Sequence, residues 1–361
     1  MRHLDAVELA KQLVEINSEN PPGNEKDISY FIRDYLRDNG FSPKIVRIQR
    51  NRYNLVLKLK GDRDGIMLNG HMDTVPIGDD WSYNQGEIKN GRLYGRGAVD
   101  MKGGLAALLS AFTKVKEINK TVLVLLTSDE EVNFLGARAA VKNRSLFNGV
   151  KYGLIAEPTN FKIQIAQKGI LELRYKFFGK SAHGSMPQLG TNAILKANRV
   201  MNRLNKYAEE IKKRKSAILG APTINIGRIL GGTKANVVPD YCEFDVDRRI
   251  IPEEDIKSVE MEMKNLASGL GDVDCIIRRN PMFLDRNVKL IRVIKQITGA
   301  KEFGTSGYTE AELYYTELGI KAVAFGPGDE RMSHVVNENI PIRDIKKAEG
   351  LYKRIIEAII A

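Results

Sequence analysis

The chain has 361 residues, of which 43% are apolar and 28% are charged, as is typical of a globular protein with more than one domain. The 56 Lys and Arg residues exceed the 45 Asp and Glu residues and give a net charge of +11, but most of the excess is scattered among acidic residues. The one dense basic run, at 212–215, has no interleaved aromatic residues for base stacking, so we expect a solvated surface and no nucleic-acid partner.

The sequence contains neither a membrane-span pattern nor an export signal. Its apolar runs are much shorter than the roughly 18 residues that suggest a membrane helix. The first residues, MRHLDAVELAKQLVEI, mix charges with Leu and Val at helical spacing, unlike the apolar core of a signal peptide. We therefore expect a cytoplasmic protein without membrane contact. Cys242 and Cys275 are the two cysteines of the chain, and we expect both to be buried or half-buried thiols.

Up to about residue 166, the chain alternates between strand and helix patterns. NLVLKLKG (54–61) and GIMLNGHMD (65–73) are predicted strands, and DMKGGLAALLSAFTKVKE (100–117) has apolar residues at helical spacing. KTVLVLLTSDEE (120–131) and YGLIAEPT (152–159) contain the continuous apolar runs of buried parallel strands. This alternation predicts an α/β sheet domain.

From about residue 169 the order of the predicted elements changes. Strands in ILELRYKFFG, TINIGRI, YCEFDVDRRI and VDCIIRR alternate with helices predicted at 191–207 and 253–266. The resulting order, β-α-β-β-α-β, is typical of a ferredoxin-like domain. The α/β pattern returns after Pro281, so we predict one discontinuous domain at 1–168 and 283–361, with the domain at 169–282 inserted into it.

Side chains that can bind metal follow several predicted strands. Ligands of open α/β sheets gather beyond the carboxyl ends of the strands, so residues far apart in sequence can converge there. Each has an ordinary structural explanation when taken alone, such as a helix N-cap, but carboxylates gathered at one sheet edge repel each other unless a cation neutralises them. These residues are His71, Asp73, Glu130, Glu131 and Glu157, with Asp100 just before a helix.

The ligand types at these positions favour a catalytic metal site. Mixed His and carboxylate ligands suit Zn²⁺, Co²⁺ or Mn²⁺ better than Mg²⁺ or Ca²⁺. Asp73 is placed to accept the second ring N–H of His71, which would fix the tautomer of a ligand imidazole. The adjacent Glu130 and Glu131 would let one carboxylate bind metal while the other meets metal-bound water, which a structural site does not need.

The ordered motifs of the chain resemble those of the dinuclear zinc amidohydrolases. This family includes succinyl-diaminopimelate desuccinylase, acetylornithine deacetylase, aminoacylase and the glutamate carboxypeptidases. The resemblance covers nearly the whole chain and implies a mixed-sheet catalytic α/β domain interrupted by a ferredoxin-like lid that serves for homodimerisation. It is carried by NSENPPGNE, LNGHMDTVP, GRGAVDMKGG, TSDEEVNFLGA, AEPT, GKSAHGSMP, GGTKANVVPD, DVDRR and FGPGDERMSHVVNE.

The resemblance also implies a ligand set for two Zn²⁺ ions. His71 and Glu157 would bind one ion, Glu131 and His334 the other, and Asp100 would bridge them. The ligand types leave Co²⁺ and Mn²⁺ open as the native metal. The peptide bond after the bridging aspartate is often cis in this family.

Further roles follow from the same resemblance. Glu130 matches the general base, Asp73 the partner of the ligand histidine, and His183 a lid histidine that reaches the substrate's carbonyl oxygen in the partner subunit's active site. Glu310 stands where many relatives have aspartate. Positions associated with the substrate or its pocket are Asn236, Arg249 with Arg248 as the alternative, Thr309, Gly326 and Gly328.

The predicted reaction is hydrolysis of the amide bond of an N-acyl amino acid or a short peptide. A deacylase and a metallo-carboxypeptidase or dipeptidase need the same metals, base and carboxylate clamp, so the motifs leave both open. The compact length and the lack of an export segment favour the deacylase. A metal-binding protein without catalysis is the alternative from another class. Such a protein would not need Glu130 and His183, so the presence of both argues against it.

Overall fold

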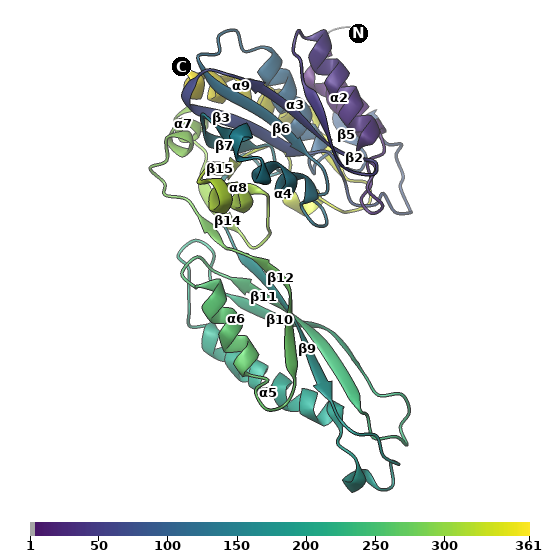
Figure 1. Cartoon of the computed structure of the whole chain (residues 1–361). Helices are drawn as coiled ribbons and strands as arrows, with labels where there is room; N and C mark the ends of the chain where they lie inside the picture. The colour runs from purple at the N-terminus through teal and green to yellow at the C-terminus, as the bar shows by residue number, and fades with distance from the viewer. Residues whose placement is uncertain (1–3) are drawn as a thin grey trace. The chain divides into compact units, whose positions relative to one another are not determined.

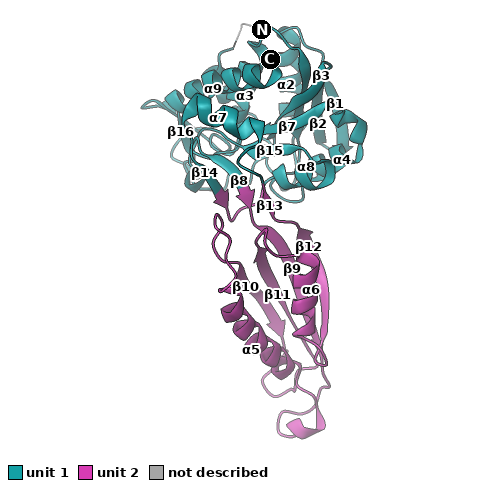
Figure 2. Ribbon diagram, turned by 90° about the vertical axis from the view of Figure 1, so that its left-hand side faces the viewer, with its two compact units in different colours: residues 1–165, 284–303, 309–361 teal, residues 166–283, 304–308 magenta. Residues whose placement is uncertain are grey.

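The computed structural model describes residues 4–361, and the chain divides into two compact units (Figures 1 and 2). Unit 1 comprises residues 1–165, 284–303 and 309–361, and unit 2 comprises residues 166–283 and 304–308. The sequence predicts an inserted domain at 169–282 but not the short return of the chain into unit 2 at 304–308.

A nine-stranded sheet has the order β1-β2-β6-β3-β7-β15-β8-β13, with β14 also paired to β8. β3 pairs in parallel with β6 and β7, and β7 pairs in parallel with β15, whereas β1, β2 and β8 form antiparallel pairs. This mixed sheet confirms the predicted fold class. Its strands are β1 (Lys44–Gln49), β2 (Arg52–Leu59), β3 (Asp62–His71), β6 (Lys120–Thr127), β7 (Val150–Ile155), β8 (Ile163–Gln167), β13 (Met282–Phe283), β14 (Glu302–Thr305) and β15 (Lys321–Ala324).

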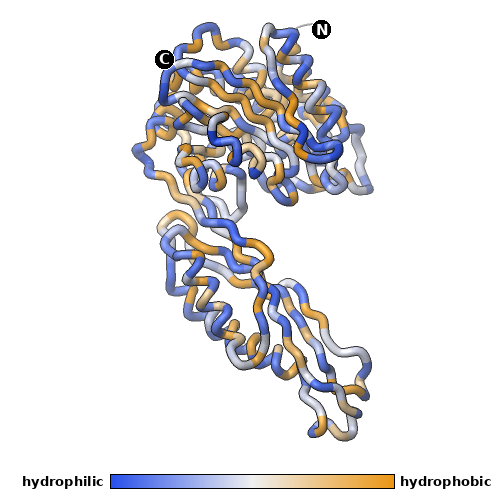
Figure 3. The backbone as a smooth tube through the Cα atoms, in the orientation of Figure 1, coloured by the Kyte–Doolittle hydropathy of each residue, from blue (hydrophilic) through white to orange (hydrophobic). Residues whose placement is uncertain are grey.

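Helices pack on this sheet, and its central strands are apolar (Figures 1 and 3). Every residue of β6 after Lys120 is buried, as expected of a strand covered on both faces. The helices of unit 1 are α1 (Ala6–Glu15), α2 (Lys26–Asp38), α3 (Lys102–Thr113), α4 (Leu135–Lys142), α7 (Lys289–Thr298), α8 (Ala311–Leu318) and α9 (Ile342–Ile360). A separate small sheet has the order β16-β5-β4, from β4 (Ile88–Lys89), β5 (Arg92–Tyr94) and β16 (Asn339–Pro341).

Helix α3 is buried almost along its whole length, because it packs against α1, α9 and β3. Its first turn approaches the neighbouring backbone so closely that only glycine fits. A Cβ atom on Gly104 would lie 2.2 Å from the carbonyl oxygen of Ala156, and one on Gly103 would lie 2.3 Å from that of Ala98. The two glycines of DMKGG therefore allow the start of α3, just after Asp100, to lie against the segment that leads into Glu157.

Unit 2 has a four-stranded antiparallel sheet in the order β10-β11-β9-β12, with α5 and α6 on one face (Figure 2). Its element order is the β-α-β-β-α-β order expected from the sequence. The elements are β9 (Gly169–Phe178), α5 (Ala193–Ile211), β10 (Thr223–Gly231), β11 (Tyr241–Ile250), α6 (Ile256–Asn265) and β12 (Asp272–Arg279).

The strands of unit 2 alternate between a buried and an open face. In β9, Leu171, Tyr175 and Phe177 are fully buried in a core that also takes apolar residues of α5 and α6. The open face carries charged residues such as Arg174 and Asp245, whose Nε and Oδ1 atoms lie 2.7 Å apart. This period-two alternation explains why the strands could be located from the sequence.

Two smaller expectations can be compared directly with the structure. Cys242 is buried and Cys275 is half-buried, and both are free thiols, as predicted. Within residues 4–361, no helix combines the length and apolar character that a membrane span requires.

Candidate metal centre

Five side chains of unit 1 converge beyond the carboxyl ends of the central strands, and we call them the metal centre. His71 is the last residue of β3, while Glu131 and Glu157 lie in the loops that follow β6 and β7. Asp100 precedes α3, and His334 lies in the loop between β15 and β16. The convergence of strand ends is the one expected for an α/β sheet.

The two oxygens of Asp100 face different histidines. Oδ1 lies 3.1 Å from Nε2 of His71, and Oδ2 lies 3.5 Å from Nε2 of His334. Each histidine has a second carboxylate neighbour: Glu157 Oε1 lies 4.0 Å from His71 Nε2, and Glu131 Oε2 lies 3.2 Å from His334 Nε2. The arrangement is thus two His-carboxylate pairs that share Asp100.

The charges of this group fit a bound cation. Burial raises the pKa of Glu157 well above its ordinary value, and the charges of Asp100 and Glu131 raise it further, although His71 opposes the shift. Burial also raises the pKa of Glu130, with Glu157 and Glu131 adding to the shift against the effect of His71. Carboxylates crowded in this way cannot all ionise without a positive charge between them, and imidazole with carboxylate is a donor set suited to zinc-like ions.

The histidines respond in the opposite direction. Hydrogen bonds to Asp100 and Glu131 raise the pKa of His334 to about 10. Burial lowers the pKa of His71, but the hydrogen bond to Asp100 and the nearby carboxylates outweigh it and raise the pKa well above its ordinary value. The carboxylates around both imidazoles thus favour a positive charge at this place.

Asp73 supports the centre through atoms that the sequence did not indicate. Nδ1 of His71 lies 2.9 Å from the main-chain oxygen of Asp73 but 3.7 Å from its carboxylate Oδ1. The atom of Asp73 that lies nearest to the second ring nitrogen of His71 is therefore its main-chain oxygen. The carboxylate instead accepts the main-chain N–H groups of Glu130 and Glu131, at 3.1 and 3.2 Å.

The sequence analysis did not identify two residues, Asn20 and Arg52, that take part in the hydrogen bonds around Asp73. Nδ2 of Asn20 donates to Asp73 and to Asp129, at 2.9 Å in each case. Arg52 donates from Nη1 to Asp129 and from Nη2 to Oδ1 of Asn20, both at 2.6 Å. The motif NSENPPGNE gave a signal for Asn20, but nothing in the local sequence marked Arg52.

The remaining candidates of unit 1 lie in buried or tightly packed segments. Oε2 of Glu310 accepts hydrogen bonds from Tyr314 and Thr127, at 2.8 and 3.0 Å. The hydroxyl of Thr309, just before α8, accepts the main-chain N–H of Ala311, with nitrogen and oxygen 3.4 Å apart. Glu310 is therefore a buried carboxyl group in the interior of unit 1.

The two glycines predicted near the pocket pack against the segment of Glu157. A Cβ atom on Gly326 would lie 2.5 Å from the carbonyl oxygen of Glu157, and Gly328 has a φ of +88° that favours glycine. The peptide bond between Asp100 and Met101 is cis.

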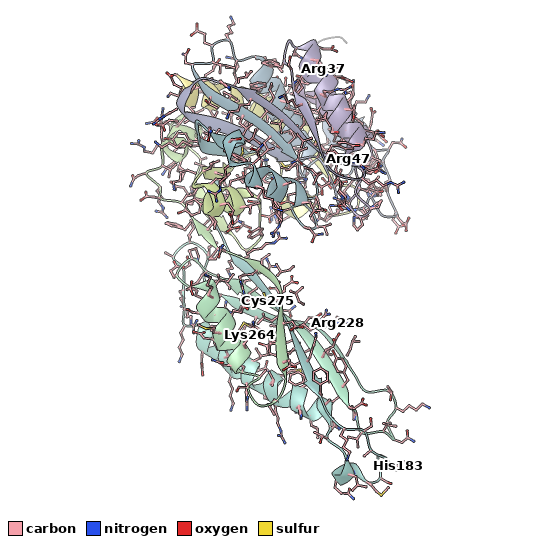
Figure 4. The ribbon with its side chains drawn as sticks, viewed as in Figure 1. Arg37, Arg47, His183, Arg228, Lys264 and Cys275 are labelled. Atoms are coloured by element: carbon pink, nitrogen blue, oxygen red, sulfur yellow. The ribbon has the colours of Figure 1, made fainter. Side chains whose placement is uncertain are left out.

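In unit 2, His183 and Asn236 lie in adjoining loops. Both are exposed, and Gly184 donates its N–H to the carbonyl of Asn236 at 2.8 Å. His183 follows β9 and is labelled at the end of unit 2 in Figure 4. Its Nδ1 lies 2.7 Å from the hydroxyl of Ser185.

The two neighbouring arginines of β11 point to opposite faces of the sheet. Arg248 is fully buried, and its Nη2 lies 2.6 Å from Oε1 of Glu254. Arg249 is half-buried on the open face, where its Nε lies 2.9 Å from Oδ1 of Asp247. Of the two, Arg249 has the accessible guanidinium group.

Comparisons with known proteins identify a family model and related sequences. The family model described as peptidase family M20/M25/M40 matches residues 67–358. A probable succinyl-diaminopimelate desuccinylase of Staphylococcus aureus is 29% identical over 380 aligned residues, covering 93% of each chain. Acetylornithine deacetylase of Myxococcus xanthus is 31% identical over 326 residues, covering 84% of this chain and 83% of that protein.

The fold is also similar to that of a solved structure. A dinuclear metal-binding peptidase of the M20 family from Bacillus subtilis has a TM-score of 0.75 and 15% identity, covering 98% of this chain and 97% of that one. At this identity the likeness concerns the fold alone.

Proposed function

The chain belongs to peptidase family M20/M25/M40 and is a metal-dependent hydrolase, and we propose that it cleaves the amide bond of N-acyl amino acids. The observation that carries this proposal is that each oxygen of Asp100 faces a different histidine, in a pair with its own carboxylate. The names of the relatives, a desuccinylase and a deacetylase, support the deacylase class.

The proposed ligands are His71 and Glu157 for one ion and Glu131 and His334 for the other, with Asp100 shared. We propose Zn²⁺, with Co²⁺ or Mn²⁺ as possible replacements. When bound, the metal would supply Lewis acidity, which would lower the pKa of a bound water and polarise the substrate carbonyl.

Glu130 is the proposed general base. It is half-buried, it neighbours the proposed ligand Glu131, and its main-chain N–H donates to the carboxylate of Asp73. It would take a proton from the attacking water and pass it to the leaving nitrogen. The bond broken is the C–N bond of the amide, and the products are a carboxylic acid and an amine.

The substrate contacts are proposed on unit 2. Arg249 would hold the substrate carboxylate as a forked donor, because Arg248 is already buried and paired with Glu254. We further propose that the chain forms a homodimer through unit 2, in which Asn236 and His183 of the partner subunit contact the substrate. His183 would donate to the carbonyl oxygen as negative charge develops on it.

A metallo-carboxypeptidase or dipeptidase is the second candidate. The family description and the Bacillus subtilis protein both concern peptidases, and the same base and ligands would serve a peptide bond. The non-catalytic alternative considered from the sequence is not supported, because the family assignment makes the chain a hydrolase.

The test is release of free amine from a panel of succinyl-diaminopimelate, acetylornithine, other N-acyl amino acids and dipeptides. Metal-stripped and zinc-restored protein should be compared, with Glu130→Gln as the matched inactive control. Zinc-dependent turnover of an acyl amino acid is the expected result. Cleavage of dipeptides alone would overturn the deacylase proposal in favour of the peptidase.

A further inference from the structure

Two buried charged residues join the loops that carry Asp100 and His334. Nη1 of Arg96 lies 2.8 Å from Oε2 of Glu338, and their side chains are 6% and 0% exposed. Arg96 lies between β5 and α3, whereas Glu338 comes 242 positions later, just before β16. The ion pair therefore connects segments that are distant in the chain but adjacent in unit 1.

The other oxygen of the Glu338 carboxylate fixes the segment of Asp100. Oε1 accepts the main-chain N–H of Val99 at 2.8 Å and that of Asp100 at 3.1 Å. Both N–H groups lie immediately before α3, where the chain turns so that the side chain of Asp100 faces the two histidines. Loss of this acceptor would leave both buried donors unsatisfied.

The guanidinium of Arg96 contacts the segment of His334. It donates to the carbonyl of Val335 at 3.1 Å and to that of His334 itself at 3.4 Å. It also donates from Nε to the carbonyl of Pro76 at 3.1 Å, in the loop that follows β3. One side chain thus binds the main chain of two loops that adjoin the metal centre.

The backbone of His334 needs such support. Its φ of 64° lies in the left-handed region, which costs free energy for a residue with a Cβ atom and persists only where surrounding contacts enforce it. The carbonyl of His334 is one of the acceptors of Arg96.

We propose that Arg96 and Glu338 are positioning residues that hold Asp100 and His334 at the separation required for binding two metal ions. This inference rests on the dinuclear centre proposed above. Buried ion pairs contribute little net stability compared with apolar replacements, so a structural role alone is a weak explanation for burying this one. Residues that orient ligands typically change metal affinity by about 10- to 100-fold when they are replaced.

A second buried ion pair provides a matched control. Arg248 and Glu254 in unit 2 have side chains that are 0% and 4% exposed, with nitrogen and oxygen 2.6 Å apart. Glu254→Gln and Glu338→Gln each remove one buried negative charge opposite an arginine. They differ in that Glu254 belongs to unit 2, whereas all five ligands belong to unit 1.

The experiment is titration of the metal-stripped proteins with Zn²⁺ by calorimetry, and with Co²⁺ by its visible absorption. Wild type and Glu254→Gln should both bind two equivalents with the same affinities. Glu338→Gln should bind at least one equivalent about tenfold or more weakly, with an altered Co²⁺ spectrum, while circular dichroism shows that it is folded. Arg96→Lys keeps the positive charge but loses the several N–H donors of the guanidinium, and it should show a smaller loss of metal affinity.

Two results would contradict the proposed positioning role, and they can be told apart. Unchanged titrations of Glu338→Gln and Arg96→Lys, beside a wild type that binds two equivalents, would overturn the positioning role alone. A wild type that binds fewer than two equivalents would overturn the dinuclear centre and this inference with it. If Glu338→Gln does not fold, the milder Arg96→Lys decides the question.

Discussion

The side-chain nitrogen of Asn20 lies 2.9 Å from Oδ2 of Asp73, inside unit 1. Asp73 in turn accepts the N–H groups of Glu130 and Glu131, so two successive hydrogen bonds connect Asn20 to the main chain of the proposed base.

Asn20→Asp should therefore impair both stability and turnover. The change replaces the donor to Asp73 and Asp129 by an acceptor, and a buried group that loses its hydrogen-bond partner costs about 1 to 3 kcal/mol, although Arg52 would still contact the new carboxylate. Urea denaturation and kcat should both register the change. Asn17→Asp, at an exposed position of the same loop, should have a much smaller effect; equal effects of the two variants would contradict a specific role for Asn20.

Glu130→Gln and Glu131→Gln should separate catalysis from metal binding. The first should retain two metal ions while kcat falls by about 10²- to 10⁴-fold, because only the proton acceptor is lost. The second should lose metal, since it removes a proposed ligand. Metal content and kcat measured on the same samples distinguish the two, and a Glu130→Gln protein with near-normal kcat would rule out its role as the base.

Arg249→Ala and Arg248→Ala should have different defects, the first in substrate binding and the second in stability. Arg249→Ala should raise KM by roughly 10- to 100-fold, as expected for a charge-assisted hydrogen bond, with little change in the free energy of unfolding. Arg248→Ala should instead lower that free energy by about 1 to 3 kcal/mol, because it removes a buried charge-assisted hydrogen bond to Glu254, which keeps only Arg214 as an arginine partner. The opposite pattern would mean that Arg248 binds the substrate.

Glu310→Gln should change how stability depends on pH. Burial raises the pKa of Glu310 from 4.5 to about 7, although Tyr314 and Thr127 donate hydrogen bonds to it. A carboxyl group with a higher pKa in the folded state binds a proton there that the unfolded state has released, so its contribution to stability is lost as pH rises from 4.5 to about 7. Glutamine has no such titration.

The gain in free energy of unfolding from Glu310→Gln should therefore be larger at pH 8 than at pH 5, by up to roughly 3 kcal/mol. Urea denaturation with a chelator present, at both pH values, measures it without interference from metal binding. A gain that is the same at pH 5 and pH 8 would show that Glu310 does not titrate in this range.

His183→Ala and Glu130→Gln should complement each other if the proposed dimer shares its active sites. Each variant alone should be nearly inactive. After subunits are exchanged in an equal mixture, half of the dimers are mixed and each mixed dimer has one intact site, so about a quarter of the wild-type activity should return. Absence of recovery, with subunit exchange verified by mass, would mean that His183 acts within its own subunit or not at all.

The sequence predicted best what depends on local pattern. His71, Glu131 and Glu157 were located because each follows an apolar strand, and strand ends of one sheet meet at one edge. The choice between Arg248 and Arg249 was open because neighbouring residues of a strand point to opposite faces, and the sequence did not show which of the two faces the core. The resemblance favoured Arg249, which the structure places on the open face.

Contacts between distant segments could not be predicted. Arg52 carries no local signal, and the motifs that contain Arg96 and Glu338 do not reveal what these two residues contact, because their neighbours are brought to them only by the fold. The same reason explains why the contacting atom of Asp73 could not be predicted: whether its carbonyl or its carboxylate meets His71 depends on how the segment of Glu130 packs beside it.

The position of β15 has a consequence for synthesis on the ribosome. β15 (Lys321–Ala324) lies between β7 and β8, which are made much earlier, whereas the four strands of unit 2 all lie within residues 169–279. A nascent chain can therefore complete the sheet of unit 2 while β7 still has an unpaired edge. Such edges promote aggregation, so this interval is when the growing polypeptide depends most on chaperones.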